Sequence, residues 1–241
     1  MDNINTFLFD LDGTLLPMDN DTFTKAYFTA LVRRISPLGF EKKRLIDSVW
    51  GGIEAMVRND GSRLNEAAFW THFADVWGKE ALQYLPDFDD FYQNDFLCTK
   101  SATQPTPLSG KCIAELKQKG YTLVLATNPI FPKSATAARM AWAGLRAEDF
   151  ALVTTYENSS YCKPNPEYYA DILRRIGKKA EECVMVGNDV QEDMCAKALG
   201  IQTILVPDCL IDRTNGSLSD YNCKSLAQLY DFFCCLPAAA K

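Results

Sequence analysis

The chain has 241 residues, of which 47% are hydrophobic and 23% are charged, and its formal net charge is -6. A chain of this length can bury one sizeable core, or a core with a smaller insertion. The acidic balance argues against a surface that binds nucleic acid or an anionic membrane, because both require clustered Lys and Arg.

Residues 4–9, INTFLF, form a nearly continuous apolar run, which predicts a strand covered on both faces of a sheet. The next region, residues 17–98, contains no convincing strand and is predicted to form four helices, at about 20–35, 41–58, 65–77 and 80–96. The first of these helices begins with polar capping residues and repeats apolar side chains every four positions from Phe23 to Ile35. We therefore expect an all-helical domain inserted after the first strand.

The remainder of the chain alternates strands with helices. Apolar runs predict four further strands, at 121–127, 150–155, 183–188 and 202–207. Helical patterns lie at about 108–119, 132–143, 166–177 and 191–199, and each ends at or just before a glycine. Strands that alternate with helices form right-handed crossovers and a mainly parallel sheet. The prediction is a doubly wound α/β core built from residues 1–16 and 99–241.

Polar residues that could bind a ligand or take part in catalysis follow the predicted strands. Seven of them lie at strand ends or in the loops beyond: Asp10, Asp12, Thr127, Asn128, Lys163, Asp189 and Asp193. Open α/β sheets bind ligands outside the carboxyl ends of their strands. We therefore expect these residues, although distant in sequence, to converge at one edge of the sheet.

The charges of this group favour a metal-assisted reaction of phosphate. Several carboxylates cannot all stay ionised in one small site without compensation. Mg²⁺ is the natural partner, because it is hard, prefers oxygen and needs only a few carboxylates beside water and phosphate. Lys163 adds a compact positive charge, and Thr127 adds a hydroxyl. These parts suit phosphoryl transfer, in which positioning and charge neutralisation supply most of the rate.

The segments DLDGT, ATN, CKPNPEYY and GNDVQED, in this order, resemble the four motifs of the haloacid dehalogenase (HAD) superfamily. The resemblance covers about 1–16 and 99–207. The inserted region 17–98 resembles the family's helical (C1-type) cap only in its position, size and helical character. The resemblance implies a Rossmann-like core with a cap over the active site.

Two carboxylates would carry the chemistry by this resemblance. Asp10 would be the nucleophile and would form an aspartyl-phosphate. Asp12 would protonate the leaving oxygen and then activate the hydrolytic water. Family members that cleave carbon–halogen bonds lack an acid at the position of Asp12, so this residue indicates phosphate esters.

The resemblance also assigns the binding groups. Thr127, Asn128 and Lys163 would hold the phosphoryl group. Asp10, the main-chain carbonyl of Asp12 and Asp189 would carry Mg²⁺. The family often places the last acid directly after glycine, whereas here Asn188 intervenes before Asp189. Asp193 would be either a further acidic ligand of the metal or a group that orients Lys163 or a metal-bound water.

Other features of the sequence bear on the compartment. The segment MDNINTFLFD lacks the basic head and long apolar stretch of a secretory signal. The nine cysteines are odd in number and include no C-x-x-C pair, which favours free thiols over a disulfide framework or a zinc site. We expect a cytoplasmic protein.

The sequence therefore predicts a Mg²⁺-dependent phosphatase that hydrolyses a small phosphorylated metabolite. Its partners would include neither nucleic acid nor membrane, and it would be a monomer or a small homo-oligomer. Two alternatives stay open. A phosphomutase of the same superfamily would return the phosphoryl group to a sugar, and a silent binding or regulatory protein would keep the fold without turnover.

Overall fold

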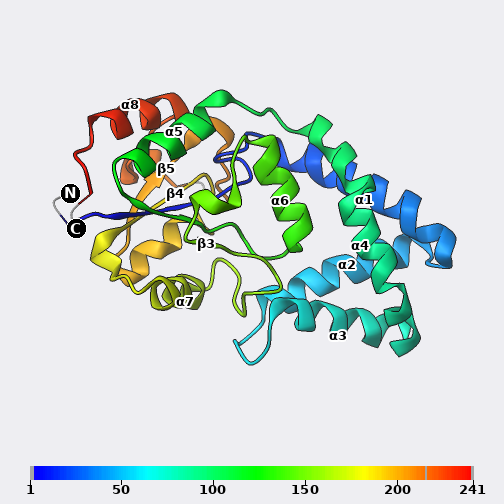
Figure 1. The fold of residues 1–241 in the computed structure, drawn as a ribbon. Helices are drawn as coiled ribbons and strands as arrows, with labels where there is room; N and C mark the ends of the chain where they lie inside the picture. The colour runs from blue at the N-terminus through cyan, green and yellow to red at the C-terminus, as the bar shows by residue number, and fades with distance from the viewer. Residues whose placement is uncertain (1–2, 215, 240–241) are drawn as a thin grey trace.

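The computed structural model describes residues 3–214 and 216–239. Within this part of the chain, five parallel strands form one sheet in the order β3-β2-β1-β4-β5 (Figure 1). The strands are β1 (Thr6–Phe9), β2 (Thr122–Leu125), β3 (Leu152–Val153), β4 (Cys183–Gly187) and β5 (Gln202–Leu205). The parallel sheet with helices on both faces confirms the predicted α/β fold class.

Strand β1 lies at the centre of the sheet and pairs with β2 on one side and β4 on the other. Phe7 and Phe9 point to one face and Leu8 to the other, and all three are fully buried. Both faces need apolar side chains, and this explains the uninterrupted apolar run in the sequence. Phe9 pairs in register with Leu125 of β2 and Val186 of β4, so the residues that follow all three strands emerge at one edge.

Helices cover the two faces of the sheet (Figure 1). On one face, α5 (Pro107–Gln118) packs against α8 (Leu226–Cys235), and the ring of Phe233 lies 5.2 Å from that of Phe7. The other face is covered by α7 (Pro166–Ile176), which contributes Tyr168, Tyr169 and Ile172. A further helix, α6 (Lys133–Trp142), follows β2. Helix α8 was not among the predicted elements.

Strands β1, β2, β4 and β5 are one to three residues shorter than predicted, and two core elements differ more. The helix expected at 191–199 is only a short 3-10 helix over Met194–Leu199. Asp189 explains the difference, because its side chain accepts the N–H groups of Gln191 and Glu192 and ties these residues into a turn. The strand expected at 150–155 is reduced to Leu152–Val153, because the side chain of Asn158 takes up the next backbone groups and turns the chain.

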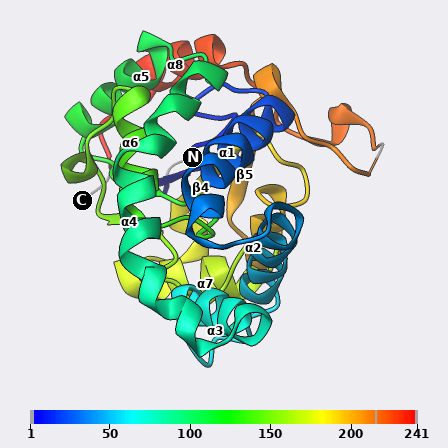
Figure 2. The ribbon, with the colours of Figure 1, turned by 90° about the vertical axis from the view of Figure 1, so that its right-hand side faces the viewer.

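The region between β1 and α5 is helical, as predicted (Figures 1 and 2). It contains α1 (Asn20–Ile35), α2 (Lys42–Val57), α3 (Asn65–Trp77) and α4 (Leu85–Gln93). The single helix expected at 80–96 is broken into α4 and two flanking 3-10 helices, over Lys79–Tyr84 and Asp95–Ala102. Pro86 accounts for the first break, since proline belongs in the first turn of a helix and restricts the residue before it.

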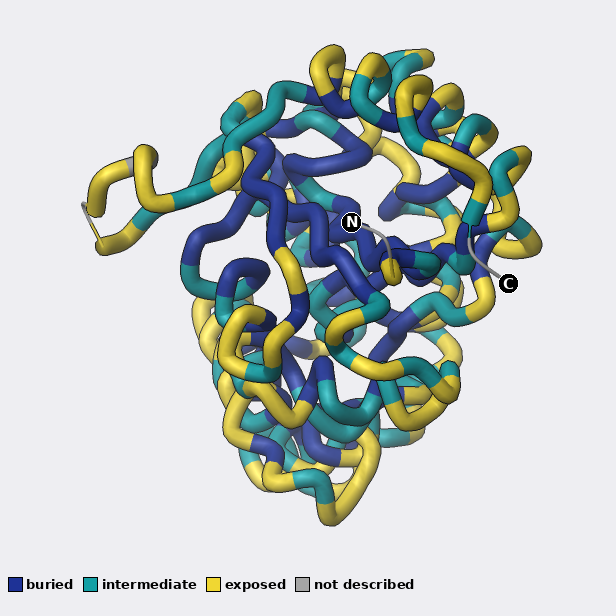
Figure 3. Tube along the Cα trace, turned by 90° about the vertical axis from the view of Figure 1, so that its left-hand side faces the viewer, coloured by how far each residue is buried: buried dark blue, intermediate teal, exposed yellow. Residues whose placement is uncertain are grey.

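The helical region shares its core with the sheet. Phe131, from the loop after β2, packs against Phe23 and Tyr27 of α1 and against Phe96. Buried side chains of both regions belong to one hydrophobic cluster, and Figure 3 shows buried stretches of chain in both the upper and the lower part of the molecule. None of the helices in the described ranges has the length and apolar character that crossing a membrane requires.

Candidate active site

Asp10 stands directly after β1, at the carboxyl edge of the sheet. Its N–H donates to the carbonyl of Val186 (2.9 Å), which continues the strand pairing for one more residue. Its Oδ1 accepts a hydrogen bond from Lys163 Nζ (2.9 Å), and its Oδ2 accepts one from the hydroxyl of Thr14 (3.2 Å). The same hydroxyl lies 2.9 Å from Oδ1 of Asn188, so the two acceptors share its single hydrogen. The carboxylate is therefore held in one orientation.

Lys163 is the buried cation of the site, with only 1% of its surface exposed. Its ammonium lies 2.9 Å from Asp10 and 2.6 Å from Asp193. Burial alone would lower the pKa of Lys163, but the carboxylates of Asp10 and Asp193 more than offset this and raise the pKa well above its ordinary value. Lys163 is therefore a permanent positive charge behind Asp10.

Asp193 and Gly187 fit each other closely. One carboxylate oxygen of Asp193 contacts Lys163, and the other accepts the N–H of Asp189 (2.9 Å), so both oxygens have partners. A Cβ atom at Gly187 would overlap the carboxylate of Asp193. Glycine is thus the residue that lets the end of β4 approach this side chain.

Thr127 and Asn128 follow β2. The carbonyl of Thr127 accepts hydrogen bonds from the hydroxyls of Thr154 (2.7 Å) and Tyr168 (2.9 Å), which fix the backbone at this point. The side chain of Asn128 accepts the N–H of Lys163 (3.2 Å) and donates to Glu192 (3.0 Å). Asn128 therefore links the loops that carry Lys163 and Glu192.

Asp12 pairs with a residue that the sequence analysis did not identify. Its Oδ2 contacts Nη1 of Arg139, a buried side chain of α6 whose guanidinium lies 4.4 Å from the ring centre of Phe131. Its Oδ1 is buried and accepts no hydrogen bond from the residues that the structure describes. Burial raises the pKa of Asp12, and Arg139 opposes the shift. No motif marks Arg139, because its role depends on which face α6 turns to the site.

Asp189, after β4, also has an unforeseen partner. Its Oδ1 accepts two N–H groups of the following turn, and its Oδ2 lies 2.8 Å from Nη1 of Arg213. Arg213 belongs to the segment after β5, which projects from the body of the molecule (Figure 2). Next to Asp189, burial raises the pKa of Glu192 to about 7, with Asp189 and Asp10 adding to the shift and Lys163 opposing it.

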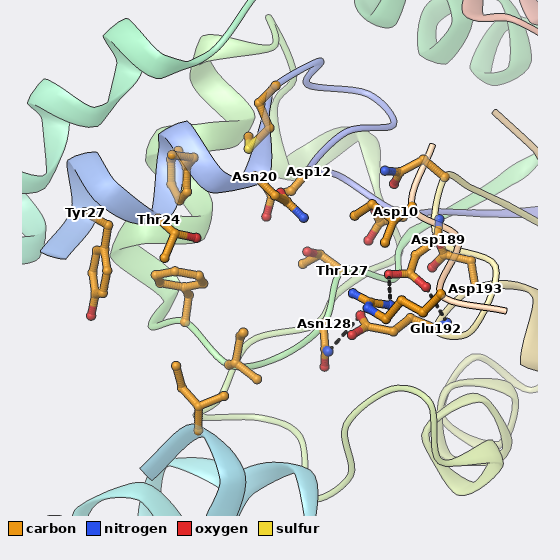
Figure 4. Close-up of a pocket in the computed structure, with 18 of the residues that line it drawn as sticks. Asp10, Asp12, Asn20, Thr24, Tyr27, Thr127, Asn128, Asp189, Glu192 and Asp193 are labelled. Atoms are coloured by element: carbon orange, nitrogen blue, oxygen red, sulfur yellow. Dashed lines mark hydrogen bonds and ion pairs between the residues drawn. The ribbon is translucent and has the colours of Figure 1, made fainter. Parts of the chain in front are cut away.

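These side chains meet at one pocket of about 190 Å³ (Figure 4). Six of the seven residues singled out in the sequence line it: Asp10, Asp12, Thr127, Asn128, Asp189 and Asp193. The seventh, Lys163, contacts two of them from behind. Much of the opposite wall comes from α1, α2 and the loop after β2. The convergence predicted from the strand ends is thus present in the fold.

The donor set of the pocket suits a hard divalent cation. Among residues 3–214 and 216–239, no three His, Cys, Asp or Glu side chains form a ready-made metal cluster. Mg²⁺ does not require one, because it is usually held by one or two carboxylates together with waters and substrate phosphate. Asp10 and Asp189 both line the pocket and are two carboxylates that could hold such an ion.

The fold and the pocket together define an α/β protein with an acidic site at the carboxyl edge of its sheet and inserted helices beside that site. Comparison with known proteins agrees. Residues 4–200 match the family of haloacid dehalogenase-like hydrolases. The match spans most of the chain, and the chain belongs to this family, as the four motifs predicted.

Individual relatives cover nearly the whole chain. It is 27% identical to the glyceraldehyde 3-phosphate phosphatase of Methanocaldococcus jannaschii over 237 residues, which are 95% of this chain and 96% of that protein. It is 24% identical to the phosphoglycolate phosphatase of Mesorhizobium japonicum, over 86% of this chain and 84% of that protein. The 2-haloacid dehalogenase of Pseudomonas syringae pv. tomato shares the fold, with a TM-score of 0.61, 21% identity and coverage of 95% and 97%.

Proposed function

We propose that the protein is a Mg²⁺-dependent phosphatase that hydrolyses a small phosphate monoester through an aspartyl-phosphate on Asp10. The observation that carries the proposal is the contact between Asp10 and the buried Lys163 at the wall of the pocket. Several similar proteins are phosphatases of small molecules, with names that specify glyceraldehyde 3-phosphate, phosphoglycolate or ribulose 1,5-bisphosphate.

Asp10 is the nucleophile in this proposal. One carboxylate oxygen attacks phosphorus, and the bond from phosphorus to the ester oxygen breaks. Lys163, fixed behind Asp10, stabilises the negative charge on the phosphoryl oxygens, and the hydroxyl of Thr127 and the side chain of Asn128 contribute further hydrogen bonds. Since these groups are already in position, little reorganisation is needed when charge develops.

Asp12 transfers the protons. As a carboxylic acid it donates to the departing oxygen. As a carboxylate it then accepts a proton from the water that attacks the aspartyl-phosphate, the bond from phosphorus to the Asp10 oxygen breaks, and inorganic phosphate leaves. The raised pKa of Asp12, caused by its burial, supports the first of these roles. Arg139 supports the second, since its guanidinium favours the ionised form.

The metal would be held by Asp10, Asp189 and the main-chain carbonyl of Asp12, and it would neutralise charge on the phosphoryl group. Asp193 is then the group that orients Lys163. Its side chain is 1% exposed, against 11% for Asp10 and 8% for Asp189, and it lies 2.6 Å from the ammonium of Lys163, which supports orientation over direct ligation.

Residues 17–98 form the cap in this proposal, with residues 1–16 and 99–241 as the catalytic core. Support comes from the pocket, since α1 and α2 supply one wall and the strand ends supply the other. A cap that closes would exclude bulk water while the aspartyl-phosphate forms.

Phosphate release from p-nitrophenyl phosphate, with and without Mg²⁺, tests the proposal. We expect Mg²⁺-dependent release that falls by about 10³-fold or more in Asp10→Asn and Lys163→Met. Lys133→Met is the matched control, because Lys133 is exposed on α6. Mass spectrometry of the acid-quenched enzyme should find phosphate on Asp10. Activity that survives in Asp10→Asn contradicts the proposal.

The two alternatives are tested in the same assays. A phosphomutase would convert a sugar phosphate into its isomer with little release of phosphate. A silent binding protein would release no phosphate from a broad panel of esters. We expect phosphate release without isomer formation.

A further inference from the structure

The pocket has two ends of different chemistry. Asp10, Asp189 and Asp193 gather at one end, and Tyr27 and Thr24 of α1 lie at the other, with Asn20 and Asp12 between them (Figure 4). Phosphate and Mg²⁺ belong at the acidic end if the proposed function is correct. The remaining end is then left for the group that the phosphate esterifies.

Apolar side chains make up most of this second end. They are Met18, Phe23, Tyr27, Phe28, Trp50, Ile53, Ile130 and Phe131. The rings contact one another, with centroids 5.5 Å apart for Tyr27 and Phe131 and 5.4 Å apart for Phe28 and Trp50. The hydroxyl of Tyr27 is already hydrogen-bonded to that of Tyr92 (2.9 Å). Asn20 and Thr24 supply the remaining polar groups of this end.

Positive charge is missing where a second anionic group of the substrate would sit. Among the described residues that line the pocket, Arg213 is the only basic one. It lies 2.8 Å from Asp189 and 3.2 Å from Gln191, so its charge is compensated at the acidic end. Arg139 lies behind the ring of Phe131, 1% exposed, and its charge is already paired with Asp12. On α1, Arg33 and Arg34 form ion pairs with Asp90 and Asp95 and do not line the pocket.

From this arrangement we propose that the substrate is a monoester of phosphate with an uncharged, mainly apolar alcohol, such as one ring or a chain of similar bulk. The inference rests on the proposed function and specifies its substrate class. A carboxylate or second phosphate on the alcohol would be buried beside Phe28 and Tyr27 without a cation, which is costly. An apolar group there gains from burial and from contact with the aromatic rings.

The size of the pocket agrees with one ring. Its volume is about 190 Å³. A dry apolar cavity of roughly 150 Å³ in another protein holds one benzene molecule. The pocket also has to hold phosphate, so the alcohol is limited to about one ring. Trp50, with 49% of its surface exposed, lies at this end and offers a ring to an incoming apolar group.

Three phosphate esters built on the same benzyl group test the inference. Benzyl phosphate, 4-carbamoylbenzyl phosphate and 4-carboxybenzyl phosphate share a leaving oxygen of similar basicity, and the last two differ in charge but hardly in size. We expect kcat/KM to be at least about tenfold lower for the carboxylate than for the carbamoyl compound, and highest for benzyl phosphate. The same order is expected for the binding of the three corresponding phosphonates, measured by calorimetry with Mg²⁺ present.

A charge placed in the pocket should reverse the preference. Thr24→Arg puts a guanidinium at the apolar end, and we expect it to favour the carboxylate over the carbamoyl compound. Thr29→Arg is the matched control, because Thr29 is exposed on the same helix, and it should keep the native order. The native comparison decides the matter even where Thr24→Arg fails to fold.

The outcomes separate this inference from the proposed function. Equal or tighter binding of the carboxylated phosphonate to the native protein overturns the inference, as does binding of none of the three. The proposed function is tested separately by release of phosphate from p-nitrophenyl phosphate. Turnover of that compound but of none of the three esters overturns the inference alone, and the order of phosphonate affinities supports or overturns the apolar site whether or not any ester is hydrolysed.

Discussion

The guanidinium of Arg139 contacts the carboxylate of Asp12, which joins helix α6 to the turn that follows β1. Arg139 is 1% exposed, so its charge has little access to solvent. Lys163 differs, because it has two carboxylate partners, Asp10 and Asp193. The loss of one acid therefore has different consequences at the two cations.

We predict that Asp12→Asn lowers the free energy of unfolding by about 3 kcal/mol, because it leaves Arg139 as a buried charge without a counterion. Asp10→Asn should lower it by less than about 1 kcal/mol, since Lys163 keeps Asp193. Urea unfolding of both variants at pH 7 measures the difference. Equal destabilisation by the two substitutions would contradict the claim that Asp12 is the counterion of Arg139.

Gly187 supports a second prediction. A methyl group at this position would overlap the carboxylate of Asp193, so Gly187→Ala should push Asp193 away from Lys163. We expect a loss of activity of about 10²-fold, because the ammonium is misplaced relative to the phosphoryl group. Steady-state kinetics with p-nitrophenyl phosphate provide the measurement.

Gly110→Ala is the matched control for this substitution. Gly110 lies within α5, and a methyl group there would meet only the carbonyl of Gly144, at an ordinary contact distance of 3.5 Å. Activity should be unchanged, and stability should rise by about 0.5–1 kcal/mol because alanine favours the helix. Full activity in Gly187→Ala would mean that Asp193 does not need its present position.

The residues at the strand ends were predictable because each comes directly after a buried strand in the sequence. A buried strand in a parallel sheet must deliver its next residues to the carboxyl edge, so Asp10, Thr127 and Asp189 could be placed together without coordinates. The central strand itself was predictable for a related reason, since only a strand covered on both faces needs an unbroken apolar run.

The partners of these residues were not predictable in the same way. Arg139 reaches Asp12 only because of the direction in which α6 packs, and Arg213 reaches Asp189 through a long segment without regular periodicity. The length of the helix at 194–199 was overestimated because of a local contact. The carboxylate of Asp189 binds backbone N–H groups that a longer helix would have contained.

Arg213 gives a third prediction, which concerns the metal. Its guanidinium occupies Oδ2 of Asp189, a carboxylate assigned to Mg²⁺ in the proposed function. Arg213→Gln should therefore lower the Mg²⁺ concentration at half-maximal activity by about three- to tenfold, since the cation no longer competes with the arginine. The Mg²⁺ concentration that is needed to protect the protein from thermal unfolding should fall as well.

Arg174→Gln is the control for the metal prediction, because Arg174 is exposed on α7 and pairs with Asp171 of the same helix. It should leave the Mg²⁺ dependence unchanged. Removal of divalent ions with EDTA should abolish activity in every variant, and added Mg²⁺ should restore it. A higher Mg²⁺ requirement in Arg213→Gln would show that Arg213 helps to bind the phosphate ester instead.

The fourth prediction concerns stability away from the pocket. Asp149 lies between Lys117 of α5 and Arg146, at 2.5 Å and 3.1 Å, and its side chain is 11% exposed. Hydrogen bonds from Arg146 and Lys117 lower the pKa of Asp149. A lowered pKa means that the folded state favours the carboxylate, so this stabilisation is complete above the ordinary pKa of about 3.9 and is lost as the pH falls through the folded-state value.

Asp149→Asn should therefore lower the free energy of unfolding by about 0.5–1 kcal/mol at pH 7 and at pH 5, because both cations are largely solvated. The gap between the stabilities of the native protein and the variant should narrow at pH 4 and below, because the carboxylate of the unfolded chain takes up a proton there while that of the folded state is still ionised. Urea unfolding across this range provides the measurement. A gap that widened on acidification would contradict the direction assigned to the pKa of Asp149.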